Sequence, residues 1–461
     1  MRTRRVILSI SVVAVALSLG VALRTPRLAA QQPAPQAPAA PPQGSQPQTP
    51  DVLLNVIASG ARKLNIVVPN FTVVAGTDTT GLAKSVPGVT ANDLRFSALF
   101  NVISDIPAPP ANNPGALREA WANFVSTGTH AALYGLLSLR GDRAQVEMRL
   151  YDLTTPEQRV IVTKTVEMPT AQARRLGHRI ADEVVLQFTG ELGIADTKLA
   201  YVSSATGQKE IYMMDYDGAG PTRLTSNQTI NLSPNWSPDT RSVAFTSYMG
   251  RGYPYMYRLF PFEHRPAQLL AGYLGINTSP SFSPDGRVLA LTLSKDGNPE
   301  IYILTLATGA LRRITTYGGI DTEPSWSPTG RQLAFVSDRS GAAQVYVMDA
   351  EGTNVRRVTS SGFNTQPRWS PKGDAIAFTS RQGTHDIWAV NPDGSNLRRL
   401  TDGAGSNESA SWAPNGRHLV FQSSRIGGYQ LFTMLADGSE QQQLTRGPGE
   451  TTSAAWSPRL P

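Results

Sequence analysis

A six-fold repeat in the second half of the chain limits what this sequence can fold into more than any other feature. An aromatic residue followed by Ser-Pro or Ala-Pro recurs at intervals of 46, 44, 43, 43 and 44 residues, at Trp236, Phe282, Trp326, Trp369, Trp412 and Trp456. This period is the length of one four-stranded blade of a β-propeller. The 40 Gly and 34 Pro of the chain also favour an architecture with many tight turns. We therefore expect a ring of blades rather than a helical bundle.

Each repeat is expected to form four short strands separated by turn residues. In the unit that begins at Pro324, the strands are expected over 324–327, 333–337, 345–349 and 355–359. Between the first two strands, Ser327 to Gly330 follows a tight-turn pattern, in which proline fixes one backbone angle and glycine accepts a positive φ. The equivalent turns often carry Asp or Asn, which suits the turn itself and favours this interpretation over a calcium or sialidase-type site.

Six copies of the second strand indicate six blades, of which one is assembled from both ends of the repeat region. The unit at Leu199 lacks its own aromatic-Ser-Pro strand. The repeat at Trp456 consists of that strand alone. The last strand is therefore expected to pair with the first unit and close the ring, which removes open sheet edges. We expect the propeller to occupy residues 196–461.

The first fifty residues carry the patterns of an export signal and a tether. Three arginines within residues 1–5 precede the apolar run 6–23 and the small residues Ala29 and Ala30, which predicts a cleaved signal peptide over residues 1–30. A retained anchor is the alternative, because the run is just long enough to span a bilayer. Residues 31–50 hold seven Pro and six Gln and predict an extended linker, with docking of a partner as a further alternative.

Net charge and cysteine content exclude two classes of protein. Residues 1–30 carry five Arg and no acidic residue, so the formal net charge falls from +7 to +2 without them. The remaining chain lacks the concentrated basic field of a nucleic-acid-binding surface. Because the sequence has no Cys, neither disulfides nor a lipid-bearing cysteine is available, and packed cores must hold the fold.

Residues 51–195 predict a small α/β domain with helices on one face of its sheet. Strands are expected over 64–68, 131–139, 146–150 and 159–166. A first helix is expected to follow Asn92 and Asp93 and to place four apolar residues on one face, namely Leu94, Ala98, Leu99 and Val102. A second helix carries apolar residues every four positions from Leu176 to Phe188 and is expected to end at Gly190.

A short polar side chain stands five residues before each repeated aromatic and leads into an innermost strand. The six are Asn231, Asn277, Asp321, Asn364, Asn407 and Thr451. They are interpreted either as a polar ring that binds a partner at one mouth of the channel, or as caps that hold their own loops in Asx turns. Both can be true, because a capped loop is a rigid platform.

The order of export signal, α/β domain and six repeats resembles a known family. Together with the blocks NTSPSFSPDGR, DTEPSWSPTGRQLAFVSDRSG and QVYVMD and the terminal AWSPRL, it resembles the TolB family of the Tol-Pal cell-envelope system over roughly residues 51–461. The resemblance implies a multidomain protein, with a small α/β domain followed by a six-bladed propeller. It also implies a periplasmic location and a role in outer-membrane integrity and cell division.

The same resemblance implies two partners and a binding site. The propeller mouth would bind a Pal-like peptidoglycan-associated lipoprotein, and the N-terminal region would engage a TolA-like inner-membrane protein. The Pal-facing mouth would include Ile276, Asn277, Ser279, Thr322 and Glu323. The family often has a histidine where this chain has Ile276, so the complementary surface of the partner is expected to differ.

Other functions that use similar repeats require features that this sequence lacks. Related propellers precede the hydrolase domain of prolyl-oligopeptidase-like peptidases, but no G-x-S-x-G motif is present. The five histidines show no metal-ligand spacing and are expected in loops or on the surface; they are His130, His178, His264, His385 and His418. Arginine pairs such as Arg356 and Arg357 are expected on outermost strands, away from the channel.

A generic protein-binding or glycan-binding scaffold is the remaining alternative. It shares the expected fold and differs only in the partner. We expect a monomeric, non-catalytic protein with no cofactor, metal, small-molecule substrate or nucleic-acid partner.

Overall fold

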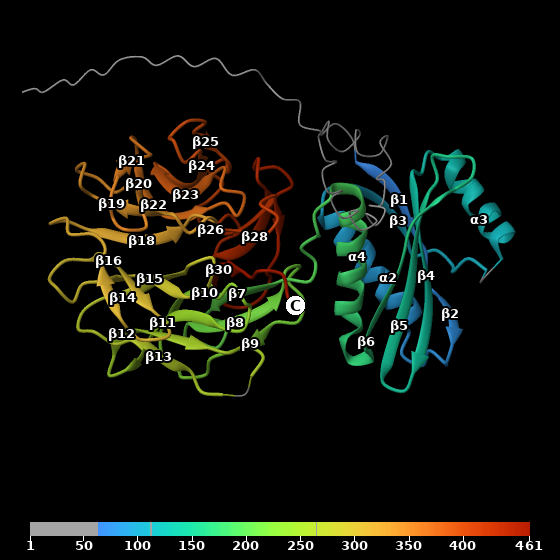
Figure 1. Cartoon of the computed structure of the whole chain (residues 1–461), viewed down its shortest axis with the longest axis horizontal. Coiled ribbons are helices and arrows are strands. Elements are labelled where there is room, and N and C mark those ends of the chain that lie inside the picture. The colour runs from blue at the N-terminus through green and yellow to red at the C-terminus, as the bar shows by residue number, and fades with distance from the viewer. Residues whose placement is uncertain (1–62, 111–112, 264) are drawn as a thin grey trace, which may run out of the picture. The chain divides into compact units, whose positions relative to one another are not determined.

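The computed structural model describes residues 63–110, 113–263 and 265–461 (Figure 1). The predicted signal peptide (1–30) and linker (31–50) lie outside the described residues. The elements of the α/β domain run from β1 (Leu64–Val68) to α4 (Ala173–Thr189), and the propeller begins with β7 (Lys198–Ser203). These limits lie on either side of the domain boundary predicted at residue 195.

The α/β domain is built on one six-stranded sheet with the order β3-β1-β4-β5-β6, to which β2 adds against β4. Strand β1 pairs in parallel with β3 and β4, while β4, β5 and β6 form an antiparallel meander. The strands after β1 are β2 (Thr72–Ala75), β3 (Phe100–Ser104), β4 (Ala131–Arg140), β5 (Arg143–Asp152) and β6 (Val160–Pro169). The helical elements before α4 are α2 (Leu82–Phe96), α3 (Pro114–Ser126) and the short η1 (Thr170–Gln172).

Hydrophobic periodicity located four of the six strands and helix α4 correctly. Strands 64–68 and 131–139 are found as β1 and β4, and the predicted strand 159–166 is found as β6. In β5 the apolar residues Val146, Met148 and Leu150 are fully buried and alternate with half-buried neighbours. Helix α4 ends at Gly190, which adopts a φ of 74°, so the predicted end of this helix is confirmed.

The first predicted helix is wrong. Asn92 and Asp93 lie near the end of α2, and the residues after it form β3. The chain leaves the helix at Ala98, whose φ of 59° cannot continue a right-handed helix. Leu94 of α2 and Leu99, which directly precedes β3, nevertheless enter the same core, which is why their spacing imitated one face of a helix.

Helices cover both faces of the sheet, so the prediction of one covered face is also wrong. Helices α2 and α4 pack on the face that buries Val146 and Met148. On the other face Leu117 and Trp121 of α3 pack against Tyr134 of β4. The sequence does indicate where α3 begins, because Asn113 is a helix-capping residue and Pro114 occupies the first helical position.

The propeller contains six antiparallel sheets of four strands within the described residues. The first three sheets are β10 (Asn231–Trp236), β11 (Val243–Gly250), β12 (Tyr253–Leu259) and β13 (Gln268–Ala271); β14 (Asn277–Phe282), β15 (Val288–Leu293), β16 (Glu300–Thr305) and β17 (Leu311–Arg313); and β18 (Asp321–Trp326), β19 (Gln332–Ser337), β20 (Gln344–Asp349) and β21 (Arg356–Arg357).

The other three sheets complete the ring. They are β22 (Phe363–Trp369), β23 (Ile376–Gln382), β24 (Thr384–Val390) and β25 (Arg398–Arg399); β26 (Asn407–Trp412), β27 (His418–Ser423), β28 (Gln430–Leu435) and β29 (Gln442–Gln443); and β30 (Thr451–Trp456) with β7, β8 (Glu210–Asp215) and β9 (Thr222–Arg223). In the last sheet Thr451 pairs with Ser203 and Trp456 with Leu199, so the predicted closure of the ring is confirmed.

The turns have the structural role that the repeat predicted, and the repeated aromatic residues pack between blades. Trp326 packs with Ala290 and Ile301 of the preceding blade, and its indole Nε1 donates to the carbonyl oxygen of Ser281 at 3.1 Å. Gly286 and Gly330, in equivalent turns, have φ values of 68° and 69°, which favour glycine. The aromatics therefore hold neighbouring blades together, and the turns reverse the chain between the first two strands of each blade.

Candidate functional site

The innermost strands β10, β14, β18, β22, β26 and β30 surround the channel, each in contact with the next around the ring. All six run in one direction, so the channel has two different ends. We call the end where these strands begin the mouth, and the end where they finish, next to the Ser-Pro turns, the turn end.

Five predicted contact residues lie beneath the surface of the mouth. Asn231, Asn277, Asp321, Asn364 and Asn407 are at most 1% exposed. The Asn277 side chain accepts from the backbone N–H of Tyr273 at 3.0 Å and donates to its carbonyl oxygen at 2.7 Å. These bonds fix the loop in front of the strand, as the capping interpretation predicted. A role of the five residues in partner binding stays a prediction, and here it would have to act through the loops that they hold.

The other predicted site residues are divided between the mouth and the interior of the channel. Ile276 is 40% exposed at the mouth. Thr322 is half-buried, and its hydroxyl lies 3.2 Å from that of Thr292 in the preceding blade. Ser279 and Glu323 line a cavity deeper in the channel. The structure therefore does not bring all of the predicted residues to one surface.

A bulge in every innermost strand explains why the residue two positions after the repeated polar residue lines the channel. The residues Ser233, Ser279, Glu323, Gln366, Ser409 and Ser453 all have φ between 52° and 57°, and the register with the second strand shifts at each one. Positive φ values are uncommon for residues other than glycine, and their recurrence at six equivalent positions shows that the β-bulge is a regular feature of the blade. The bulge places these six side chains around one cavity.

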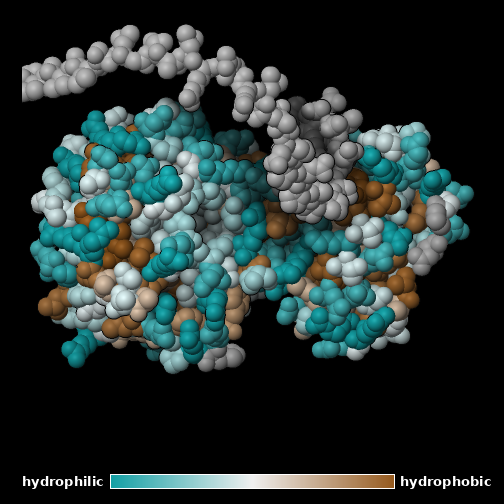
Figure 2. Space-filling view, viewed as in Figure 1, coloured by the Kyte–Doolittle hydropathy of each residue, from teal (hydrophilic) through white to brown (hydrophobic). Residues whose placement is uncertain are grey.

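An apolar arc at the mouth was missed by the sequence analysis apart from Ile276. It consists of Ile230, Ile276, Ile320 and Phe363, which directly precede the capped polar residue in four consecutive blades and are each between 40% and 45% exposed. Leu274, on the same loop as Ile276, is 75% exposed. The repeat itself could have indicated the arc, because an apolar residue directly precedes the repeated polar residue in these four blades. On the face of the propeller visible in Figure 2, polar residues dominate and apolar ones form small patches.

The channel cavity has a volume of about 410 Å³ and extends to the turn end. Its walls are largely serines of the innermost strands, the repeated aromatics and the prolines of the turns. Glu323 and Arg368 are the charged residues that line it. Burial raises the pKa of Glu323 despite a hydrogen bond from the backbone N–H of Gln366, and burial lowers the pKa of Arg368 despite the nearby Glu323.

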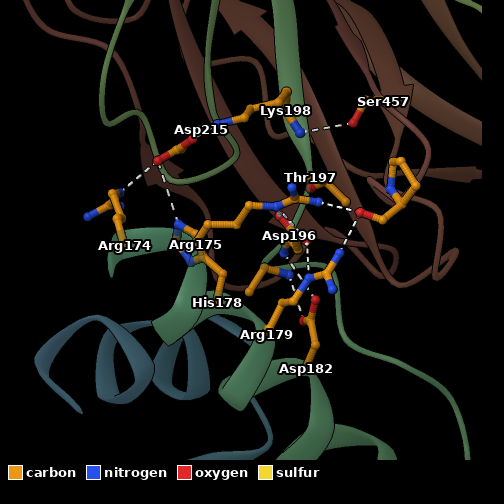
Figure 3. A network of polar contacts seen from close by, with 12 residues as sticks. Arg174, Arg175, His178, Arg179, Asp182, Asp196, Thr197, Lys198, Asp215 and Ser457 are labelled. Carbon is orange, nitrogen blue, oxygen red and sulfur yellow. Dashed lines mark hydrogen bonds and ion pairs between the residues drawn. The ribbon is translucent and has the colours of Figure 1, made fainter. Parts of the chain in front are cut away.

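A buried charged cluster joins the α/β domain to the propeller (Figure 3). The His178 imidazole of α4 lies between two carboxylates: Nδ1 is 2.7 Å from Asp93 Oδ2 in α2, and Nε2 is 3.5 Å from Asp215 Oδ2 in β8. Asp215 also pairs with Lys198 and with Arg174, whose Nε donates at 2.7 Å. The hydroxyl of Tyr216 donates to Asp93 Oδ1 at 2.7 Å. We call this group the His178 cluster.

Ionisation within the His178 cluster is strongly perturbed. Burial alone would lower the pKa of His178, but Asp215 and Asp93 outweigh it and raise that pKa to about 9. Burial acts to raise the pKa of Asp215, yet His178 and Lys198 hold it well below its usual range. His178 is therefore a buried imidazolium at neutral pH, compensated by carboxylates from both domains.

A second group of polar contacts fixes the segment between the domains. The Asp182 carboxylate accepts the backbone N–H groups of Ala195 and Asp196 at 2.7 and 3.0 Å. Burial raises the pKa of Asp182 to about 6 although these bonds oppose it. The Arg175 guanidinium reaches Asp196 at 2.8 Å and the carbonyl oxygen of Pro461 at 2.6 Å (Figure 3). The segment that follows the ring-closing strand is thus tied to the α/β domain.

Two histidines contradict the prediction of loop or surface positions. His178 and His418 are each 3% exposed. His418 stacks on Phe96 of α2 with ring centroids 5.4 Å apart, and burial lowers its pKa to about 4. His130 and His385 are half-buried, and His264 lies outside the described residues. Among the residues that the structure describes, no group of three or more His, Cys, Asp or Glu could hold a metal ion.

These features define a two-domain propeller protein that presents a repeated, partly apolar mouth at one end of its channel. The chain belongs to the TolB family: residues 185–460 match the TolB beta propeller domain and residues 52–159 match the TolB amino-terminal domain. Its relatives are named as Tol-Pal system components, and the chain is not an enzyme.

Individual relatives support the assignment over part or most of the chain. The Tol-Pal system protein TolB of Desulfosudis oleivorans is 34% identical over 55% of this chain and 58% of its own length, and that of Geobacter sulfurreducens is 40% identical over 42% and 44%. The matches thus span about half the length of these curated relatives. The crystal structure of TolB from Acinetobacter baumannii aligns with a TM-score of 0.74 and 27% identity, covering 86% of this chain and 97% of that one.

Proposed function

We propose that this chain is the periplasmic protein-binding component of a Tol-Pal envelope complex. In this proposal the mouth of the propeller binds a Pal-like peptidoglycan-associated lipoprotein, and the N-terminal region engages a TolA-like inner-membrane protein. The complex would support outer-membrane integrity and cell division. The names of the relatives support the assignment to this system.

The observation that carries the proposal for the mouth is the apolar arc. Burying an exposed aliphatic or aromatic side chain contributes roughly 1.5–3 kcal/mol when the side chain leaves water completely. Four such side chains at equivalent loop positions form a repeated apolar surface, and the capped polar residues beneath them keep the loops rigid. Pre-ordered loops lose little entropy on binding, which favours association.

Export to the periplasm belongs to the same proposal. The pattern over residues 1–30 supports a signal peptide, with a mature chain that begins near Gln31. Among the described residues no helix combines the length and the apolar character needed to cross a bilayer. The mass of the chain purified from the cell envelope distinguishes cleavage near Gln31 from a retained anchor.

Calorimetric titration of the full-length mature chain with its own Pal-like partner tests the mouth. The substitution Phe363→Asp places a charge within the apolar arc and should weaken binding by about 2 kcal/mol or more. Val355 is a matched control, because it is an exposed apolar residue beside the outermost strand β21. Loss of affinity with Val355→Asp and full affinity with Phe363→Asp would reject the mouth as the binding site.

A further inference from the structure

The channel cavity is lined by equivalent positions of six blades, so a departure from the shared residue type is directly visible. Two positions after the repeated polar residue of each innermost strand stand Ser233, Ser279, Glu323, Gln366, Ser409 and Ser453. Four positions after it stand Asn235, Ser281, Ser325, Arg368, Ser411 and Ala455. Neutral residues predominate in both sets. The two charged exceptions, Glu323 and Arg368, lie on the neighbouring strands β18 and β22 and line the same cavity.

The packing of the blades does not call for an arginine at position 368. In three other blades the equivalent side chain accepts the backbone N–H of the next innermost strand: Asn235 from Phe282 at 3.2 Å, Ser325 from Trp369 at 3.0 Å, and Ser411 from Trp456 at 3.0 Å. A guanidinium has no acceptor atom and cannot form this bond. Arg368 Nη1 instead donates to the carbonyl oxygen of Pro367 at 3.0 Å.

Neither charge in the cavity is neutralised by a close partner. No ion pair within 4.0 Å joins Arg368 or Glu323 to an opposite charge among the described residues. One Glu323 oxygen accepts the backbone N–H of Gln366 at 2.5 Å, and the other carboxylate oxygen has no such bond there. Partly desolvated charges of opposite sign that do not meet each other can each gain from a ligand of complementary charge.

We propose that the channel cavity binds a short zwitterionic peptide, with its carboxylate on Arg368 and its ammonium group on Glu323. A peptide of two residues is about 7 Å long when extended, and its two charged ends can each reach one of two protein charges that do not pair with each other. The 410 Å³ cavity holds a molecule of that size, and its serines and aromatic rings offer partners for amide groups and small apolar side chains. The proposal does not rest on the identity of the partner at the mouth.

Isothermal titration calorimetry of the mature chain with dialanine tests this site. N-acetyl-dialanine lacks the ammonium group and dialanine amide lacks the carboxylate, so each should bind at least about tenfold more weakly, a loss of about 1.4 kcal/mol. Arg368→Ser and Glu323→Ser introduce the residue that equivalent positions already carry, and each should weaken dialanine binding by a similar factor. Arg357→Ser, on the outermost strand β21 and outside the cavity, is the matched control and should leave binding unchanged.

Thermal unfolding of the variants separates binding from folding. Arg368→Ser should be as stable as the parent chain or more stable, because serine can restore the bond between blades. The proposal is overturned if dialanine does not bind at about 10 mM, if the blocked forms bind equally well, or if both charge variants keep full affinity. It is also overturned if acetate competes as well as dialanine, which would indicate a simple anion site, or if Arg368→Ser weakens only the partner at the mouth.

Discussion

The two ends of the propeller use charged and apolar side chains in opposite ways. At the turn end, carboxylates and cations of both domains pair around His178 beside the apolar contact of Phe96 with Tyr216, and together they hold the α/β domain on the propeller. At the mouth, the repeated polar residues are buried within their own blades and apolar residues are exposed above them. A permanent contact within one chain can pair its buried charges when the chain folds. A surface that binds and releases a separate partner gains most of its binding energy from exposed apolar groups.

Removing the closing strand should cause the largest change. Deletion of residues 450–461 removes β30, exposes an edge of β7 and takes away the contacts of Arg459 and Pro461 with the α/β side of the molecule. We expect aggregation and loss of cooperative unfolding, measured by light scattering and calorimetry. Deletion of residue 461 alone is the control, because it keeps β30. Unchanged solubility and thermal stability of the longer truncation would contradict the role of ring closure.

Breaking the His178 cluster should have the next largest effect. Asp215→Asn removes one of the charges that compensate His178, Lys198 and Arg174. We expect a loss of about 3 kcal/mol, because Lys198 loses its carboxylate partner while His178 keeps Asp93 and Arg174 keeps Asp217. Urea unfolding followed by tryptophan fluorescence measures the loss, and separate transitions of the two domains would indicate that their coupling is lost. Asp437→Asn is the control, because this carboxylate serves a surface turn. Equal stability of both variants would show that the cluster contributes little.

The propeller fold could be predicted because the same short sequence pattern repeats in every blade. The His178 cluster and the exposed side chains of the mouth could not be predicted in this way. Six copies of one blade pattern specified the propeller and its closure, because strands and turns follow from short-range sequence. The His178 cluster brings together residues that are far apart in sequence, such as Asp93 and Asp215, and no spacing rule connects them. At the mouth the repeat located the loops in front of the innermost strands but not which side chains point outward, because Asn277 is buried and Ile276 is exposed.

The pH dependence of stability should be smaller and follows from His178. Its pKa in the folded chain is about 9, above the ordinary 6.5, so its stabilising contribution is complete below pH 6.5 and is lost as the pH rises through 9. The change over this range is about 3 kcal/mol at most. Urea unfolding at pH 6.5 and pH 9 measures it, with His178→Gln expected to flatten the slope. A parent chain that is equally stable at both values would contradict a buried imidazolium.

Hydrogen–deuterium exchange with and without the Pal-like partner tests most directly whether the two ends have different roles. If the mouth binds the partner, exchange should slow in the loops that lead into the innermost strands, over residues 228–231, 274–277, 317–321 and 361–364. The turns at the other end, over residues 283–287, 327–331 and 370–374, should exchange at unchanged rates. Protection of these turns with unchanged exchange at the mouth would contradict the account.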